Sequence, residues 1–184
     1  MYLPMTLAIA GTLFHRFTSH PRVIENEPFD FRCSAGNRGL MGHQRNLAEM
    51  PRNIIMAASL PAPPDSLFEM YLDTASHASI TGLPAIIQPR AGGVFRAFDG
   101  RVFGTILHIE PKTLIVQTWR SANWPLTDMD SVLTLSFWPT RDGARIELVQ
   151  VNVPEEDFAG VSQGWEKYYW IPWRTYLMTQ TPSL

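Results

Sequence analysis

Cysteine is almost absent from this chain, since Cys33 is the only one among 184 residues. An intramolecular disulfide needs two cysteines and a cysteine-based structural zinc site needs several, so a single cysteine excludes both. The chain also has no long run of basic residues, and its formal net charge is -2. It therefore lacks the positive surface that binds nucleic acid or anionic lipid. These features favour a reducing, cytoplasmic setting without a nucleic-acid partner.

Long hydrophobic runs are missing as well. Residues 5–14 form the one apolar run near the start, and they are fewer than the roughly 20 residues that a membrane-spanning helix needs. No basic segment precedes them, so we expect neither a signal peptide nor a membrane partner.

The sequence also lacks the motifs that hold metals, nucleotides or catalytic nucleophiles. No two of the five histidines have the HxxxH or HExxH spacing of a zinc site, and neither GxSxG nor GxxxxGK occurs. Cys33 has no histidine pattern around it that would favour a nucleophile. We therefore expect no metal, no cofactor and no catalytic residue that the sequence alone can name, which makes a non-enzymatic role the favoured one.

Two regions of the chain differ in composition. Residues 1–52 carry Gly, Asn, Arg, His and Pro without any periodicity, which predicts an irregular or partly disordered extension. From Asn53 onward the hydrophobic pattern becomes regular, so residues 53–180 are predicted to form one domain.

Seven β-strands are predicted in the second region, from apolar runs that turn residues separate. The clearest turn is Asp99 followed by Gly100, which is expected to form a two-residue hairpin loop because glycine adopts a positive φ at no steric cost. The predicted strands cover residues 53–60, 85–88, 94–98, 102–109, 114–120, 131–138 and 144–153.

Helices are expected in three places. Asp65 is predicted to cap a short helix after the first strand, and residues 74–81 form a second short helix that Gly82 ends. Aromatic residues recur through 162–177 as in a long amphipathic helix. Pro172 removes a backbone donor in that helix, so we expect a kink near Tyr168.

The element order and the central residues resemble a known family. The segment AGGVFRAFDGRVFGTILHIEPKTLIVQTWRSANWP contains a Gly-Gly-aromatic strand, a DG hairpin, a Gly in the next strand, a Trp-Arg pair and a Trp-Pro loop, and GWEKYYW follows. In this order they resemble activators of the 90-kDa heat-shock chaperone ATPase and their bacterial homologues. That family lies in the START-like (SRPBCC, birch-pollen-allergen-like) superfamily.

This resemblance implies an α+β helix-grip fold. A seven-stranded curved antiparallel sheet wraps around a long C-terminal helix, and two short helices follow the first strand. Such folds leave a cavity between the sheet and the long helix, so residues that face inward are both core residues and candidates for contact with a ligand.

Strand pairing and alternation predict which side chains face this cavity. If Asp99 and Gly100 form the turn, Phe95 lies opposite Gly104, where an added side chain would collide with it, and Phe98 lies on the solvent face. The fifth and seventh strands flank the sixth, so Gln117 and Gln150 are expected to point into one space. The predicted ligand-binding residues are Phe95, Ile106, Gln117, Trp119, Leu135, Phe137, Leu148, Gln150, Trp165 and Tyr169.

Three functions remain open at this point. The first is a non-catalytic carrier or sensor that binds a small hydrophobic or amphipathic molecule, and the second is a chaperone-associated stress protein that acts through its surface. The third is a cyclase- or hydratase-like enzyme, for which His108 is the one acid or base that alternation places inside. An open cavity above about 300 Å³ favours the first or third. A filled core with an exposed apolar patch favours the second.

Overall fold

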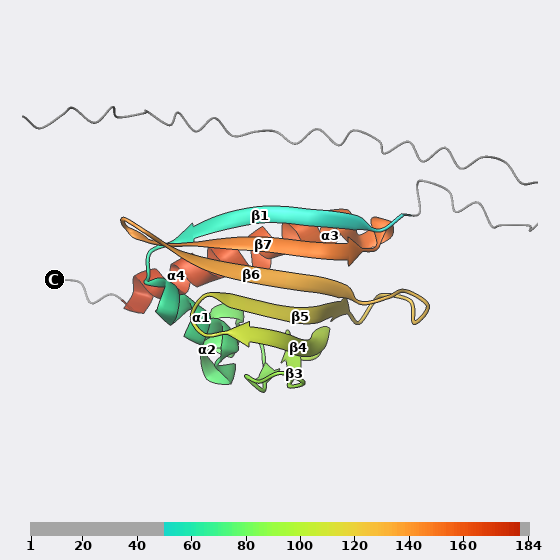
Figure 1. Ribbon diagram of the computed structural model, residues 1–184, viewed down its shortest axis with the longest axis horizontal. Coiled ribbons are helices and arrows are strands. Elements are labelled where there is room, and N and C mark those ends of the chain that lie inside the picture. The colour runs from blue at the N-terminus through green and yellow to red at the C-terminus, as the bar shows by residue number, and fades with distance from the viewer. Residues whose placement is uncertain (1–49, 181–184) are drawn as a thin grey trace, which may run out of the picture. The chain divides into compact units, whose positions relative to one another are not determined.

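Seven antiparallel strands form one curved sheet in this computed structural model, which describes residues 50–180 (Figure 1). The strands lie in the order β1-β7-β6-β5-β4-β3-β2, so the first strand pairs with the last. Their number and antiparallel pairing confirm the predicted sheet. The bounds are β1 Arg52–Leu60, β2 Ile86–Ile87, β3 Val94–Ala97, β4 Val102–Glu110, β5 Leu114–Ser121, β6 Ser131–Thr140 and β7 Gly143–Val153.

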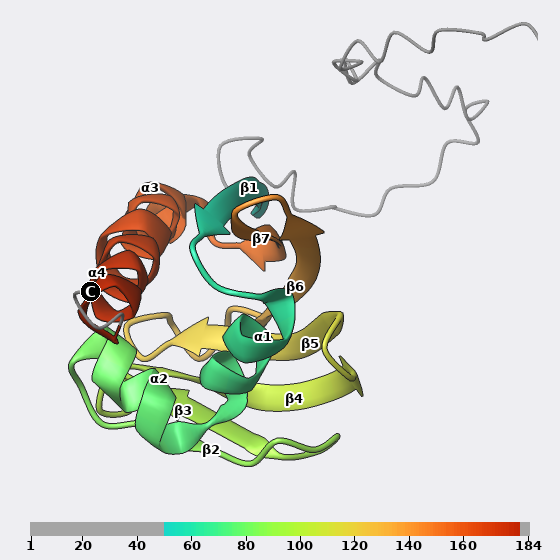
Figure 2. The ribbon, with the colours of Figure 1, turned by 90° about the vertical axis from the view of Figure 1, so that its left-hand side faces the viewer.

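The helices lie against one face of this sheet, and Figure 2 shows the sheet curving around them. Two short helices follow β1, as predicted. A long helical segment follows β7 and confirms the helix-grip arrangement. The bounds are α1 Pro64–Leu72, α2 Thr74–Thr81, α3 Glu155–Trp165, a π-helical turn η2 Glu166–Trp170, and α4 Ile171–Gln180.

The concave face carries the core, because every second side chain of a strand points to the same face. Leu133, Leu135 and Phe137 of β6 are buried as alternation predicted, and the inward positions of β7 are buried too. Phe68 of α1 packs edge-on against Phe137, with ring centroids 5.6 Å apart. The sheet and the short helices therefore share one hydrophobic core.

The long helix changes its hydrogen-bonding pattern where Pro172 predicted a disturbance. A proline at this position has no N–H to donate to the carbonyl four residues before it, which belongs to Tyr168. The helix adopts a π-helical turn there, and the N–H of Ile171 donates to the carbonyl oxygen of Glu166. This wider turn places Tyr169 and Trp170 among the buried residues.

One local prediction needs correction. Asp65 lies inside the first turn of α1, where the N-cap is Pro63, and its carboxylate accepts a hydrogen bond from Lys112 at 2.7 Å.

The hairpin turn forms at Asp99 and Gly100 as predicted. Their φ angles are 57° and 79°, and the N–H of Arg101 donates to the carbonyl oxygen of Phe98 at 3.2 Å. The register is also as predicted, with Phe95 opposite Gly104. Phe98 has a positive φ of 54° as well, so the turn conformation begins one residue before Asp99.

Phe98 takes a different position from the one predicted. Its backbone has a positive φ, which rotates the side chain away from the solvent face that strand alternation predicted. The ring packs edge-on against Tyr169 with centroids 5.2 Å apart. Phe98 is thus part of the inner aromatic layer.

His108 lies outside the core, which corrects the inward position predicted for it. The pairing of β4 with β5 shifts by one residue between Ile106 and His108. An extra residue in one strand reverses the alternation beyond it, so His108 points to solvent with 59% of its side chain exposed. The structure therefore removes the acid or base that the enzyme hypothesis relied on.

Gly104 is tightly enclosed, although Phe95 is not the group that encloses it. A Cβ at this position would lie 1.9 Å from the carbonyl oxygen of Thr118 on β5, and the nearest atoms all belong to Thr118. The Thr118 hydroxyl accepts a hydrogen bond from the Thr105 N–H at 2.8 Å. The predicted collision with Phe95 is corrected to one with the backbone of the neighbouring strand.

The extension predicted for residues 1–52, together with Cys33, lies outside the described residues except for 50–52. Every helix and strand of the described part begins at or after Arg52. We therefore expect a chain that lacks residues 1–50 to unfold cooperatively, with a melting temperature within a few degrees of the full chain. Differential scanning calorimetry of both chains tests this. Loss of the transition on truncation would show that the extension belongs to the core.

Candidate ligand-binding pocket

A pocket of about 460 Å³ opens beside the long helix. Its wall combines the end of α2, the β3–β4 hairpin, the end of β5 and the inner side of α3 and η2. Distant parts of the chain meet here because the curved sheet brings β4 and β5 toward the helix (Figure 2). Five rings contribute to its lining: Phe98, Trp119, Trp165, Tyr168 and Tyr169.

The rings at the base of the pocket pack on one another. Trp165 stacks on Tyr169 with centroids 4.7 Å apart, and Trp119 lies 6.4 Å from Trp165. All three are at least nine-tenths buried. Contacts of this kind hold ring positions, so the base of the pocket is a rigid aromatic surface.

The mouth of the pocket is polar by contrast. Arg101, Asn123 and Asp157 contribute to its lining. The Asp157 carboxylate accepts a hydrogen bond from the indole N–H of Trp124 at 2.7 Å, and it lies in the first turn of α3, where the helix dipole favours negative charge. A molecule in this pocket would meet aromatic carbon at the base and charged or amide groups at the mouth.

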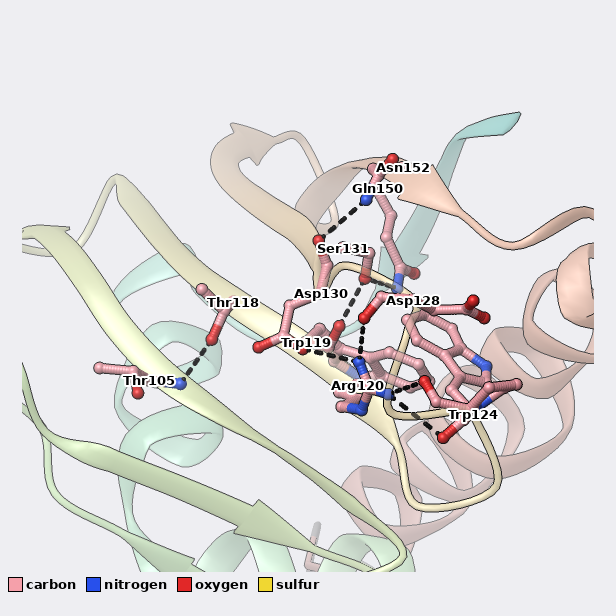
Figure 3. A network of polar contacts seen from close by, with 11 residues as sticks. Thr105, Thr118, Trp119, Arg120, Trp124, Asp128, Asp130, Ser131, Gln150 and Asn152 are labelled. Carbon is pink, nitrogen blue, oxygen red and sulfur yellow. Dashed lines mark hydrogen bonds and ion pairs between the residues drawn. The ribbon is translucent and has the colours of Figure 1, made fainter. Parts of the chain in front are cut away.

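The loop between β5 and β6 packs against the Trp119 side of the pocket. Arg120 is buried and reaches into the loop, as Figure 3 shows. Its guanidinium donates to the backbone oxygens of Trp124, Pro125 and Asp128 and pairs with the Asp130 carboxylate at 3.1 Å. Because one planar cation connects several loop carbonyls, it holds Trp124 against Trp119, with ring centroids 5.5 Å apart.

A chain of hydrogen bonds crosses the core between β5 and the long helix. The indole N–H of Trp165 donates to the amide oxygen of Gln150 at 2.9 Å. The Gln150 amide nitrogen donates to the Ser131 hydroxyl at 2.9 Å, and that hydroxyl donates to the Trp119 carbonyl at 2.7 Å. Both polar ends of the Gln150 side chain are therefore in use within the protein.

Gln117 is buried to the same degree but has different neighbours. It is fully buried and lies next to the Tyr71 hydroxyl. Burial, and then the nearby Tyr169, raise the pKa of Tyr71 well above its usual value, while a hydrogen bond with the Gln117 side chain acts in the opposite direction. The Trp119 indole N–H is buried without a hydrogen-bond partner among the described residues.

His77 and Tyr169 form a buried pair beside these groups. The Nδ1 of His77 lies 2.8 Å from the Tyr71 carbonyl oxygen, which only accepts, so Nδ1 carries the proton. Its Nε2 then accepts a hydrogen bond from the Tyr169 hydroxyl at 3.2 Å. Burial lowers the pKa of His77 to about 4, and burial raises the pKa of Tyr169. The pair is therefore uncharged at neutral pH.

Comparison with known proteins identifies the family. A sequence model described as Activator of Hsp90 ATPase homolog 1-like protein matches residues 61–171. The chain belongs to this family. Those residues run from the end of β1 to the start of α4 and include every residue that lines the pocket. The resemblance seen in the central block is thereby confirmed.

Relatives of the Hsp90 ATPase activator type are distant in sequence. Activator of 90 kDa heat shock protein ATPase homolog 1 of Homo sapiens is 26% identical over 106 residues, which cover 58% of this chain and 31% of the human protein. The Dictyostelium discoideum activator homologue is 26% identical over 107 residues, which cover 56% of this chain and 27% of that protein. The match thus spans about a third of the length of these relatives.

Solved structures share the fold. PFC0360w, described as an HSP90 activator from Plasmodium falciparum, has a TM-score of 0.60 and 18% identity and covers 69% of this chain and 96% of its own. CalU16 from Micromonospora echinospora has a TM-score of 0.58 and 26% identity and covers 72% of this chain and 78% of its own. Both support the helix-grip assignment.

The ten residues predicted to bind a ligand fall into two groups in this family member. Trp119, Trp165 and Tyr169 line the open pocket. The other seven are buried in the core and do not line it: Phe95, Ile106, Gln117, Leu135, Phe137, Leu148 and Gln150. Whether any of the ten contacts a ligand stays a prediction.

Sequence reasoning did not find His77, Tyr71, Phe98 or Asp157. Helical periodicity placed Tyr71 on the buried side of α1 without showing that it lies next to Gln117 of β5. Nothing in the sequence around His77 distinguishes it from the other histidines, because its partners come from the end of α1 and from η2.

Among residues 50–180, no group of three or more His, Cys, Asp or Glu side chains could hold a metal ion, and no helix is long and apolar enough to cross a membrane.

Proposed function

We propose that this domain binds a small hydrophobic or amphipathic molecule in the pocket beside the long helix and works as a non-catalytic carrier or sensor in the cytoplasm. The observation that carries the proposal is the open pocket of about 460 Å³ with an aromatic base. Its volume lies in the range of about 300 to 1,000 Å³ that ligand pockets occupy.

The arrangement of polarity supports an amphipathic ligand. When an apolar molecule covers aromatic surface that water reaches, binding is favoured by about 25 cal/mol per Å² of surface removed from water. Among the lining rings, Phe98 and Tyr168 are partly exposed and offer such surface, whereas Arg101 and Asp157 lie at the mouth. A ligand with an apolar body would place that body inward and any charged group outward.

Gly164 offers a direct test of the pocket. It lies in α3 and lines the pocket, and a Cβ there would make ordinary contact with the Tyr168 ring at 3.6 Å. We expect Gly164→Ala to retain binding, and Gly164→Leu and Gly164→Phe to weaken it by about tenfold or more as the side chain occupies ligand space. Helix propensity predicts unchanged or slightly higher melting temperatures.

Tryptophan fluorescence is the measurement, because two indoles line the pocket. Decanoic acid, naringenin and 2-naphthol represent fatty acids, flavonoids and polyketide-like aromatics. Gln163→Leu is the matched control, since Gln163 is exposed on the same helix and does not line the pocket. Binding that Gly164→Phe leaves unchanged would place the site elsewhere, and no binding by any of the three compounds would contradict a carrier or sensor role.

The second candidate is a chaperone-associated stress protein. Relatives named as activators of the 90-kDa heat-shock protein ATPase favour it. Apolar side chains on the outer face of β1 and β7 would suit a surface role, since Ile55 is 77% exposed and pairs with Val149, itself 37% exposed. Absence of ligand binding in the titration would move our proposal to this function.

A cyclase- or hydratase-like enzyme is the least supported. The buried acid–base candidate is now the His77–Tyr169 pair in place of His108. With a pKa of about 4, the imidazole is a weak base at neutral pH, and its Nε2 already accepts a hydrogen bond from the Tyr169 hydroxyl.

A further inference from the structure

One side of the pocket mouth carries hydrogen-bond donors. The start of β4 and the end of β5 meet there, since Val102 pairs with Ser121. One residue further along, the N–H of Ala122 donates to the carbonyl oxygen of Arg101 at 2.8 Å. Arg101, Ser121 and Asn123 all line the pocket. A guanidinium, a hydroxyl and a side-chain amide therefore come from neighbouring positions of the lining.

These three donors are open to a ligand. Arg101 is exposed, and its guanidinium forms no ion pair with any described residue. The Ser121 hydroxyl accepts a hydrogen bond from the backbone N–H of Asn123 at 3.3 Å, which leaves the hydroxyl proton available. The side-chain amide of Asn123 forms no hydrogen bond with residues 50–180.

Asp157 is the one acidic residue among the described residues that line the pocket, and its carboxylate is already in use. The indole N–H of Trp124 donates to it at 2.7 Å. It also lies in the first turn of α3, where the helix dipole favours negative charge. A ligand cation would thus meet an acceptor that has partners, whereas a ligand anion would meet donors that lack them.

The position of these donors at the mouth suits a charged group. Because Arg101 is exposed, a carboxylate beside it stays partly hydrated and avoids the large cost of burying a charge. The gain from an exposed ion pair is correspondingly modest, about fivefold in affinity. The charged end of the ligand therefore contributes selectivity, while contact with the rings supplies most of the binding free energy.

We propose that Arg101, Ser121 and Asn123 form a subsite for a carboxylate, so that the pocket selects apolar molecules that carry one carboxylate group. This inference rests on the proposed function and specifies its ligand class. The planar guanidinium supplies the positive charge and the geometry to bind both carboxylate oxygens, and the hydroxyl and the amide donate to the same group. The apolar body of the ligand lies against the partly exposed rings of Phe98 and Tyr168.

Three naphthalene compounds of nearly equal shape test the subsite by isothermal titration calorimetry on the full chain. 2-Naphthoate is an anion, 2-naphthamide is its neutral counterpart and 2-naphthylmethylammonium is a cation. At about 20 mM salt we expect naphthoate to bind about fivefold more tightly than naphthamide, and the ammonium compound to bind most weakly. The preference for naphthoate should shrink at about 500 mM salt, because salt screens exposed charges.

Substitutions of arginine assign that preference to the subsite. Arg101→Gln is expected to bring the naphthoate-to-naphthamide affinity ratio to about one, while naphthamide affinity stays within about twofold and so shows that the variant is folded. Arg101→Lys keeps the charge but not the planar fork, and should keep part of the ratio. Arg96→Gln is the matched control, since Arg96 is an exposed arginine of the same hairpin that does not line this pocket.

Asp157→Asn changes the opposite charge at the mouth. Asparagine keeps an acceptor for the Trp124 indole N–H and removes the negative charge. Naphthoate should bind about twofold or more tightly to this variant, because a like charge near its carboxylate is gone, and naphthamide affinity should stay unchanged. Weaker binding of naphthoate would contradict the subsite.

The outcomes separate this inference from the proposed function. Equal affinities for naphthoate and naphthamide in the parent protein would overturn the carboxylate subsite while leaving the pocket in place, as would a ratio that Arg101→Gln does not change. Tightest binding of the ammonium compound, or no binding of the three while naringenin or 2-naphthol binds, would overturn it too. If decanoic acid alone binds, the same comparison with decanamide decides. Only a failure of every compound in both experiments would contradict the proposed function.

Discussion

Lowering the pH from 7 to 4 should reduce the free energy of unfolding by about 3 kcal/mol through His77 alone. Its pKa is about 4 in the folded protein and near 6.5 in the unfolded chain, and burial is the main cause. Between these values the unfolded chain binds a proton that the folded protein does not, so stability is present above about pH 6.5 and is lost as the pH falls toward 4. Each unit of pKa difference corresponds to about 1.4 kcal/mol.

Urea unfolding at several pH values between 7 and 4 measures this loss. In His77→Gln the loss of stability that the imidazole causes between pH 7 and 4 should disappear. That variant should nevertheless be less stable than the parent at pH 7, because it loses the hydrogen bond to Tyr169 or to the Tyr71 carbonyl. His108→Gln is the matched control, since it makes the same replacement at an exposed histidine. If the parent and His77→Gln lose stability in parallel, the imidazole does not cause the dependence.

Gly104→Val should destabilise the domain by about 3 kcal/mol or more and lower its melting temperature by about 10 °C. A Cβ at this position would lie 1.9 Å from the Thr118 carbonyl oxygen, a distance that a packed structure cannot keep. Strands β4 and β5 would have to separate locally. That movement would disturb the Thr105–Thr118 hydrogen bond.

Thermal unfolding followed by circular dichroism measures the effect. Gly104→Ala should cost nearly as much as Gly104→Val, because the Cβ itself makes the closest approach. Gly164→Ala is the control, since its Cβ makes an ordinary contact at 3.6 Å in a helix. If alanine is tolerated at Gly104 and valine is not, the crowding comes from a side chain such as Phe95, as the strand pairing alone had suggested.

Much of the candidate site could be predicted from periodicity. Alternation placed Gln117, Trp119 and Gln150 on the inner face, and the structure buries all three. It failed at His108, because a bulge adds one residue to β4 and reverses every position after it. It also failed at Phe98, where a positive φ ends the alternation. Both errors arise where the backbone departs from the regular geometry on which the pattern depends.

The sequence by itself determined the seven strands, the register of the β3–β4 hairpin and the place where the long helix is disturbed. These follow from local chemistry: the period of apolar residues, the turn residues and the missing N–H of Pro172. The helix-grip fold class was implied by the resemblance of the central block to a known family. Tertiary structure alone decided which buried polar groups find partners. Gln117 and Gln150 are the same residue type at equivalent inward positions, yet only Gln150 meets Ser131 and Trp165. Hydrogen bonding requires particular atoms at short distance and correct angle, and residues far apart in the sequence supply them.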